Sequence, residues 1–292
     1  MIVELLISGV LISAIYALAT TGFTLLYGVS GILNLAHGTT LATAGMVAWY
    51  LGGTGLVGPL GMIAAGIIAG VVVGALTHLL IIRPIQRMGG LSSHDEHVFM
   101  LVGTLLWTII LQEGLALTFG DVPVSIPQLV PGVVRLFGVR TPISSLIVAV
   151  LAWGVICLLW LYVAGTRSGR SILAAAVNPR GLVLCGFDIN RIHRAVWIVY
   201  GAMAGLAGVL IAMVLGVSPS GGLDLTASAF AIVVLGGLGS VGGSLVASNL
   251  IGFVETATAY LVGPSLRSLP ALLILIAVLY FRPQGLFGRR AR

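Results

Sequence analysis

Residues 233–243, VVLGGLGSVGG, have the spacing of a nucleotide-binding turn. Gly237, Gly239 and Gly242 form Gly-x-Gly-x-x-Gly, and Glu255 follows at about the offset of an acid that binds a ribose hydroxyl. In a dinucleotide enzyme these glycines connect a strand to a helix within a soluble βαβ unit. The meaning of the motif therefore depends on the elements that surround it.

Other enzyme chemistry has little support. His94 and His97 have helical spacing, but the run is not His-Glu-x-x-His and no third ligand is nearby, so we predict no metal site. The chain has no lysine, which excludes a Gly-x4-Gly-Lys-Ser/Thr loop and ATP hydrolysis through it. No pairing of nucleophile and base is visible. We expect a chain that is not an enzyme and binds no cofactor.

The composition indicates that the elements around the glycine motif lie in a membrane. Of the 292 residues, 59% are hydrophobic and 8% charged, and the mean hydropathy is +1.16. Apolar stretches long enough to cross a hydrocarbon core of about 30 Å recur along the chain. The predicted fold class is an all-α polytopic membrane protein with a single transmembrane domain over residues 1–292. A soluble βαβ unit cannot exist between such spans, so the nucleotide interpretation is rejected.

The apolar stretches predict about eight to ten crossings, with nine preferred, because broken helices make the count uncertain. The predicted helices lie near residues 2–27, 34–52, 58–82, 98–119, 143–163, 196–216, 225–240, 243–262 and 268–281.

The arginines predict the orientation. Eleven of them fall in the loop at 83–87, the loop at 164–195 and the tail from residue 282. The positive-inside bias puts these segments in the cytoplasm, so the C-terminus is cytoplasmic and, with nine crossings, the N-terminus is extracytoplasmic. The net charge of +6 is explained in this way without nucleic acid as a partner. The arginines left on the outer side are Arg135, Arg140 and Arg267.

Two similar polar segments interrupt the apolar sequence. GILNLAHGTT at 31–40 and GGLDLTASAF at 221–230 share a Leu-polar-Leu core at Asn34 and Asp224, and they enter the membrane from opposite sides. Opposite entry indicates an inverted repeat whose broken half-helices aim their N-terminal N–H groups at a central site. The substrate-pathway residues that we predict are Asn34, His37, Thr39, Thr40, Asp224, Gly236, Gly237, Gly239, Ser240 and Glu255.

His37 and Glu255 each have an alternative. His37 could be a neutral core histidine, hydrogen-bonded across helices, instead of a pathway residue. Glu255 lies in mid-span, where a charge is costly unless it is paired or hydrated.

Small residues recur at helical spacing in two spans. Gly66, Gly70 and Gly74 lie on one helix face, and Gly201 and Gly205 lie on another. This spacing lets helix backbones approach closely in lipid, so we predict that these faces are packing surfaces.

Five separated segments resemble the permease subunits of branched-chain amino acid ABC transporters, the LivH-like branch, in a family that also contains urea and short-chain amide permeases. The segments are YALATTGFTLLYGVSGILNLAHG, TRSGRSILAAAVNPRGLVLCGFDINR, GLAGVL, AFAIVVLGGLGSVGGSLV and FRPQGLFG. Their order and spacing cover essentially the whole chain.

The resemblance implies an importer with several partners. These are an extracytoplasmic solute-binding protein, a second related permease chain and two cytoplasmic ATP-binding subunits that hold ATP and Mg²⁺. The resemblance implies that a helix near residues 168–176, within the loop at 164–195, couples the permease to those subunits, because an amphipathic helix fits a groove. The residues alone favour a solvated loop on the positive-inside side. The coupling residues implied are Arg167, Gly169, Arg170, Asn178, Pro179, Arg180 and Gly186.

Two positions depart from the family pattern. Thr39 stands where an acid commonly follows Ala-His-Gly, which leaves the solute open. Leu173 stands where a second arginine is common, so the contact with the ATPase is expected to be more apolar.

The function expected from the resemblance is import of branched-chain or related amino acids across a bacterial inner membrane by alternating access. The alternatives are a urea or short-chain amide ABC permease and, in another class, a passive channel for a small solute.

Overall fold

The computed structural model describes residues 2–88, 90, 92–282 and 284–288, so the tail residues Arg289, Arg290 and Arg292 lie outside the described part. The chain is all-α apart from one short hairpin, as predicted. Its α-helices are α1 (Ile2–Ser30), α2 (His37–Gly53), α3 (Pro59–Thr77), α4 (Arg83–Gln86), α5 (Ser93–Phe119), α6 (Ile143–Gly165), α7 (Arg167–Val177), α8 (Pro179–Leu184), α9 (Ile189–Val214), α10 (Gly222–Gly236), α11 (Val241–Leu261) and α12 (Leu269–Phe281).

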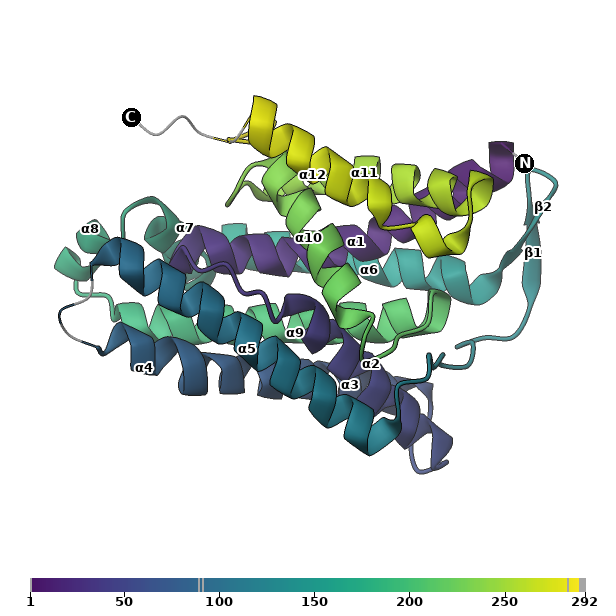
Figure 1. Cartoon of the computed structure of the whole chain (residues 1–292), viewed down its shortest axis with the longest axis horizontal. Helices are drawn as coiled ribbons and strands as arrows, with labels where there is room; N and C mark the ends of the chain where they lie inside the picture. Colours follow the sequence, from purple (N-terminus) through teal and green to yellow (C-terminus); the bar gives the residue numbers. More distant parts are fainter. Residues whose placement is uncertain (1, 89, 91, 283, 289–292) are drawn as a thin grey trace.

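Within the described residues, six helical segments are long and apolar enough to cross a membrane. They run roughly along the long axis of the molecule (Figure 1). A π-helical turn, η1 (His78–Ile82), joins α3 to α4, and a 3-10 turn, η2 (Pro264–Leu266), precedes α12. The six segments are Ile2–Ser30, Pro59–Gln86, His94–Phe119, Ile143–Gly165, Ile189–Val214 and Pro264–Phe281.

The other predicted spans, α2, α10 and α11, are not among these six. Helices α2 and α10 have 17 and 15 residues, which is short for a full crossing of about 20 residues. Helix α2 begins at buried residues, whereas α10 begins at the buried Gly222 with Leu223 and Asp224 of its first turn exposed. Helix α11 has 21 residues and a buried glutamate, Glu255, in its second half. The expected total of eight to ten crossings thus includes three helices that length and composition alone do not identify.

The two ends of the molecule differ (Figure 1). Strands β1 (Val133–Leu136) and β2 (Val139–Pro142) form an antiparallel hairpin at the end where α1 begins. Helices α7 and α8 lie at the other end. The described arginines of 83–87 and 164–195 lie at this second end, while Arg135 and Arg140 are in the hairpin. The arginines of 83–87 and 164–195, which were assigned to one side of the membrane, thus lie at one end of the molecule.

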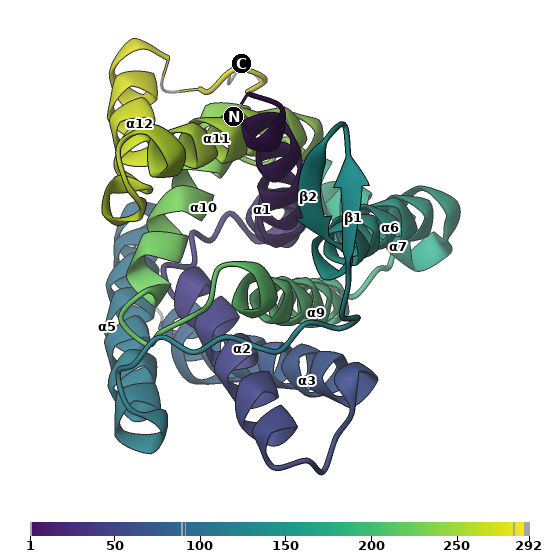
Figure 2. The same cartoon turned by 90° about the vertical axis from the view of Figure 1, so that its right-hand side faces the viewer.

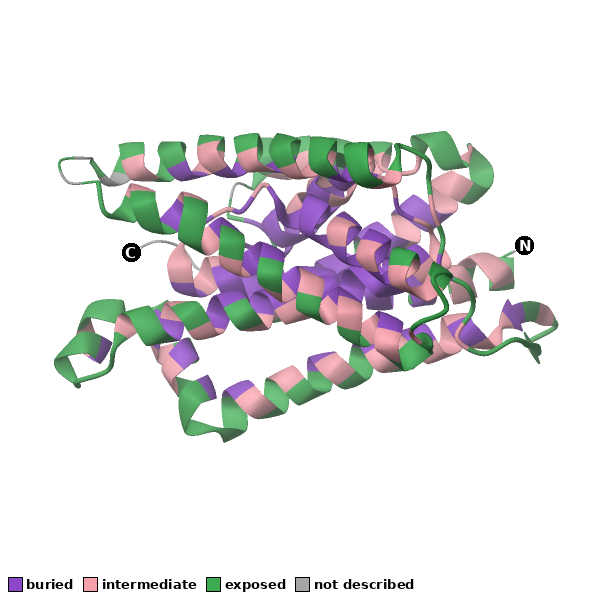
Figure 3. Ribbon diagram, turned by 90° about the horizontal axis from the view of Figure 1, so that it is seen from below, coloured by how far each residue is buried: buried purple, intermediate pink, exposed green. Residues whose placement is uncertain are grey.

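Helix α9 lies in the centre and packs against α1, α2 and α3 (Figures 1 and 2). Buried residues gather in these central helices, and the outer helices are exposed on their outward faces (Figure 3). A soluble protein would not expose so many large apolar residues, whereas in a bilayer lipid covers them.

The predicted glycine faces pack against each other, between α3 and α9. A Cβ atom added to Gly70 would overlap the carbonyl oxygen of Gly201 and lie 2.5 Å from Cα of Gly205. A Cβ atom on Gly205 would overlap the carbonyl oxygen of Gly66. Backbone therefore touches backbone, as the spacing predicted.

Candidate functional site

Half-helices α2 and α10 begin at the same place inside the protein. The Gly38 N–H donates to Oγ1 of Thr226 at 2.9 Å, and that hydroxyl lies 3.3 Å from the carbonyl oxygen of Leu35. A Cβ atom on Gly38 would overlap the carbonyl oxygen of Gly222, so only glycine fits there. From this point the helices run apart (Figures 1 and 2). Two helix N-termini, each with partial positive charge, thus meet at Gly38 and Gly222, both of which are buried.

A buried polar cluster, Asn34, His37 and Tyr200, lies beside this meeting point, and Nε2 of His37 has no partner among the described residues. Nδ2 of Asn34 donates to the Tyr200 hydroxyl at 2.9 Å, and Nδ1 of His37 is 3.1 Å from the same oxygen. The His37 ring stacks on Phe23 with centroids 4.7 Å apart. All three members of the cluster are buried. This geometry matches the alternative role of His37 as a core histidine bonded across helices.

Thr39 and Thr40 are also buried, on the first turn of α2. The Thr40 hydroxyl donates to the carbonyl oxygen of Ala36 at 2.7 Å, while Oγ1 of Thr39 has no partner among the described residues. None of the predicted pathway residues of 34–40 borders the polar cavity described next, so their role in the pathway stays a prediction.

A polar cavity of about 340 Å³, which we call the outer cavity, opens near the start of α10. It brings together Asp224 and Glu255, two of the predicted pathway residues that are 31 positions apart in the chain. The lining also contains Arg267, which sequence reasoning placed only as an outer arginine. The remaining lining residues are Tyr16, Pro123, Ile211, Leu215, Gly216, Val217, Ser218, Gly221, Leu225, Ser228, Pro264, Ser265 and Ser268.

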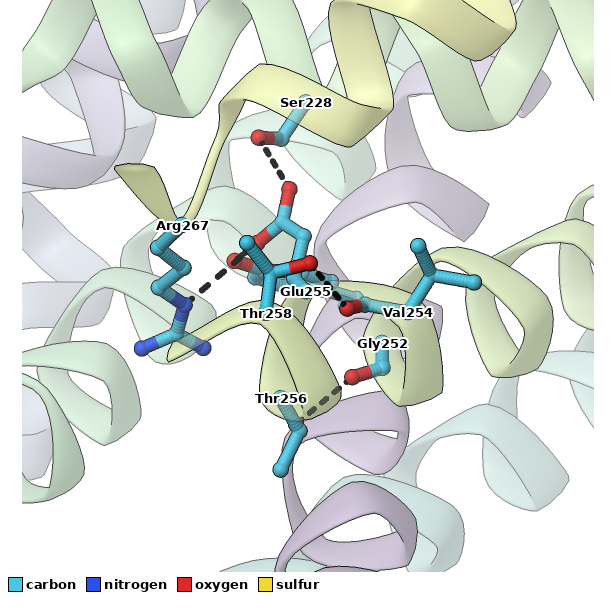
Figure 4. A network of polar contacts seen from close by, with 8 residues as sticks. Ser228, Gly252, Val254, Glu255, Thr256, Thr258 and Arg267 are labelled. Atoms are coloured by element: carbon cyan, nitrogen blue, oxygen red, sulfur yellow. Dashed lines mark hydrogen bonds and ion pairs between the residues drawn. The ribbon is translucent and has the colours of Figure 1, made fainter. Parts of the chain in front are cut away.

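Glu255 is the centre of a network in the wall of this cavity (Figure 4). Its side chain is 1% exposed, and Oε2 accepts from the Tyr16 hydroxyl at 2.5 Å and lies 3.4 Å from Nε of Arg267. Oε1 accepts from Ser228 at 2.7 Å. A buried carboxylate needs this number of partners, because its desolvation otherwise costs several kcal/mol. The network ties α1, α10 and the segment before α12 to α11.

A small space of about 10 Å³ lies next to the outer cavity, because Tyr16, Ile211, Leu225 and Ser228 line both. Its other walls include apolar residues such as Leu41 of α2 and Ile232 of α10. It has about the volume that one water probe occupies, so it does not hold an amino acid.

The predicted residues Gly236, Gly237, Gly239 and Ser240 lie at the other end of α10, away from the outer cavity. Here the motif VVLGGLGSVGG is a helix, a turn and a helix, where a dinucleotide site needs a strand. Gly237 and Gly239 have φ of +97° and +82°, in the left-handed region that favours glycine. The Ser240 hydroxyl accepts from the Gly243 N–H at 3.1 Å and caps α11.

The C-terminal segment covers this glycine turn. The Leu286 N–H donates to the carbonyl oxygen of Leu235 at 2.8 Å, and Phe287 donates to that of Gly236 at 3.2 Å. These carbonyls end α10 and would otherwise lack partners. Gly285 has φ of +74°, and a Cβ atom there would be 2.5 Å from Cα of Gly237. The segment thus acts as the C-cap of α10.

Gly285→Ala is expected to detach this cap, because the added methyl would overlap the backbone of α10. Hydrogen exchange of the Leu286 and Phe287 amides should become about tenfold faster or more. The matched control is Gly120→Ala: its φ of +80° imposes the same strain, but nothing lies within 4 Å of the new atom. Equal hydrogen-exchange rates of the Leu286 and Phe287 amides in both variants would contradict the role of this segment as the C-cap of α10.

The predicted coupling segment folds as two short helices, α7 and α8. The Thr166 hydroxyl caps α7 by accepting from the Gly169 N–H at 2.9 Å. Asn178 ends α7, and its side chain caps α8 by accepting from the Gly181 N–H at 2.9 Å, with Pro179 as the first residue of α8. This agrees with the helix expected near 168–176.

One face of α7 is buried and the other is free. A Cβ atom on Gly169 would overlap the carbonyl oxygen of Tyr162, so α7 packs closely on the end of α6. Gly186 has φ of +82° and turns the chain toward α9. The exposed residues of α7, α8 and their junction are Arg167, Ser168, Arg170, Leu173, Ala176, Val177, Asn178, Pro179, Arg180, Val183 and Leu184.

Comparison with known proteins identifies the family. A family model described as the permease component of the branched-chain amino acid transport system matches residues 5–279. The chain is 30% identical to the high-affinity branched-chain amino acid transport system permease protein BraD of Pseudomonas aeruginosa, over 97% of this chain and 95% of that protein. No solved structure matches significantly.

Two further relatives agree with this. The high-affinity branched-chain amino acid transport system permease protein LivH of Escherichia coli is 25% identical over 97% of this chain and 94% of its own length. The ribose import permease protein RbsC of Escherichia coli is 28% identical over 91% of this chain and 82% of its own. This multi-pass membrane chain therefore belongs to the family of permease components of branched-chain amino acid ABC transporters.

Proposed function

We propose that this chain is a permease subunit of an importer that carries branched-chain or related amino acids across a bacterial inner membrane by alternating access. The observation that carries the proposal is the outer cavity, which is charged, lies at the start of half-helix α10 and adjoins, beside Leu41 of α2, a space of about 10 Å³ that is too small for an amino acid. A site open on one side and sealed by a few apolar side chains is what alternating access requires.

The proposed partners follow from the two ends of the molecule. A solute-binding protein delivers the amino acid at the hairpin end, where the N-terminus is extracytoplasmic. Two cytoplasmic subunits bind ATP and Mg²⁺ and contact α7 and α8, and a second related permease chain completes the pathway. ATP hydrolysis belongs to those subunits and not to this chain.

The free surface of α7 and α8 suits such a contact. It combines Arg170 and Arg180 with the apolar side chains of Leu173 and Leu184, which are 45% and 89% exposed. Helices that insert into a groove present this pairing of apolar anchors and a charged rim. A motion of α7 would reach the pathway through α6 and α1, against which α7 packs.

The relatives do not favour a urea or amide permease, because their names refer to branched-chain amino acids and ribose. A passive channel is the alternative that experiment must exclude.

Combined Arg170→Ala and Asn178→Ala exchange is expected to reduce ATP-driven uptake at least tenfold in vesicles that hold the complete transporter. The double exchange removes the contact of Arg170 with the ATP-binding subunits. It also removes the Asn178 N-cap of α8, and such a cap stabilises a helix by about 1 kcal/mol. The control is Arg135→Ala, since Arg135 is an exposed arginine on β1 at the opposite end. Undiminished uptake that does not need ATP would overturn the importer and support the channel.

A further inference from the structure

We propose that the outer cavity binds the zwitterion of an aliphatic α-amino acid, with Arg267 as the partner of its carboxylate and Asp224 as the partner of its ammonium group. The inference rests on the proposed function and assigns the two residues that select the solute.

Arg267 has donors that the protein does not use. A guanidinium group carries five N–H donors, and this one contacts Glu255 through Nε at 3.4 Å and also interacts with the Tyr16 hydroxyl. Its Nη2 atom is buried and has no partner among the described residues. Because a buried charged donor without an acceptor is costly, the position requires an acceptor that the described chain does not supply.

The geometry of the ion pair favours a carboxylate as that acceptor. Glu255 meets Arg267 at Nε, over a long distance, and the Nη2 side of the guanidinium fork is buried without a partner among the described residues, so a solute reaches it once the side chain turns toward the cavity. That side can hold both oxygens of a carboxylate in two parallel hydrogen bonds, which a hydroxyl or an amide oxygen cannot form.

Asp224 provides the complementary charge. It borders the same cavity from the first turn of α10, is exposed, and has no hydrogen bond or ion pair with the described part of the chain. The lining thus has two carboxylates and one guanidinium group. A zwitterion adds one charge of each sign: its ammonium group pairs with Asp224, and its carboxylate shares Arg267 with Glu255. Urea, an amide or a sugar leaves Asp224 unpaired.

The rest of the wall suits an aliphatic side chain. Ile211, Leu215, Val217, Leu225 and Pro264 line the cavity beside the charged groups. The volume of about 340 Å³ lies within the range of small-molecule sites. Glu255 is a positioning residue in this arrangement: Tyr16 and Ser228 fix its carboxylate, and the carboxylate orients Arg267.

Binding of four ligands to the complete transporter in nanodiscs, without the binding protein, tests the assignment. The ligands are leucine, leucinamide without the carboxylate, 4-methylpentanoate without the amine, and isopentylamine with the amine alone. The variants are Arg267→Gln and Asp224→Asn, with Arg135→Gln as the control.

We expect the unmodified transporter to bind leucine at least about tenfold more tightly than leucinamide or 4-methylpentanoate. Arg267→Gln should weaken leucine binding by about tenfold or more and abolish the preference over leucinamide, while leaving isopentylamine binding within twofold. Asp224→Asn should abolish the preference over 4-methylpentanoate. Because Asp224 is exposed, this variant stays informative if Arg267→Gln does not fold.

Unchanged preferences in both folded variants would overturn the assignment. ATP-driven leucine uptake by the unmodified transporter separates this failure from failure of the proposed function. If the unmodified transporter takes up leucine but both variants keep its ligand preferences, only the zwitterion site is refuted. If the unmodified transporter takes up no leucine, the proposed function is refuted.

Discussion

Gly70→Ala is expected to lower the free energy of unfolding by about 2 kcal/mol, because the added methyl overpacks the contact between α3 and α9. Its Cβ would overlap the carbonyl oxygen of Gly201 and lie 2.6 Å from the backbone nitrogen of Gly205. Neither backbone atom can rotate away as a flexible side chain would, so the helices must separate. Thermal unfolding in detergent, followed by tryptophan fluorescence, measures the loss.

The control for this prediction is Gly114→Ala on α5. Nothing lies within 4 Å of the new methyl group, and the residue is exposed. In both variants alanine gains about 1 kcal/mol of helix propensity over glycine, so the difference between them isolates packing. Equal stability of the two variants would show that α3 and α9 do not touch through their glycines.

Glu255→Leu is expected to be still more damaging. It leaves the Arg267 charge and the hydroxyl groups of Tyr16 and Ser228 without their acceptor, and removing one partner of a buried ion pair typically costs about 3–5 kcal/mol. Uptake by the complete transporter should fall to background, since the wall of the outer cavity loses its centre. Unfolding and uptake are measured on the same preparations.

Three variants make this result interpretable. Glu113→Leu, an exposed acid on α5, should change stability by no more than about 0.5 kcal/mol. Glu255→Gln keeps an acceptor and should lose less stability than Glu255→Leu. The double variant Glu255→Leu, Arg267→Leu should be more stable than the two single effects predict by addition. Additive losses would mean that Glu255 and Arg267 do not interact.

Much of the fold could be predicted because its physical causes are local. A bilayer requires long apolar helices, so the spans follow from runs of apolar residues. The glycine faces of α3 and α9 follow from a four-residue spacing on each helix. The boundary between α7 and α8 follows from two neighbouring residues, because Asn178 ends α7 and caps α8 and Pro179 begins α8.

The outer cavity could be predicted only in part. Asp224 and Glu255 stood out as acids within apolar sequence. Arg267 did not, because an arginine near a helix end is explained by the interface alone. Tyr16 and Tyr200 gave no signal, since an isolated tyrosine within a span is most simply a core side chain. Glu255 and Tyr16 are separated by 239 positions in the chain, and their contact depends on how α1 packs on α11.

The sequence by itself determined that this protein lies in a membrane, and it determined the helices, the family and the glycine contacts. These features depend on composition and short-range spacing. The tertiary structure decided which polar residues share one space. It separated the buried cluster of Asn34 and His37 from the cavity of Asp224 and Glu255, and it placed the glycines after α10 under the C-terminal segment. The physical reason is that a buried polar group is stabilised by whichever partner the packing brings to it, and in a helical membrane protein that partner comes from a helix far away in the chain.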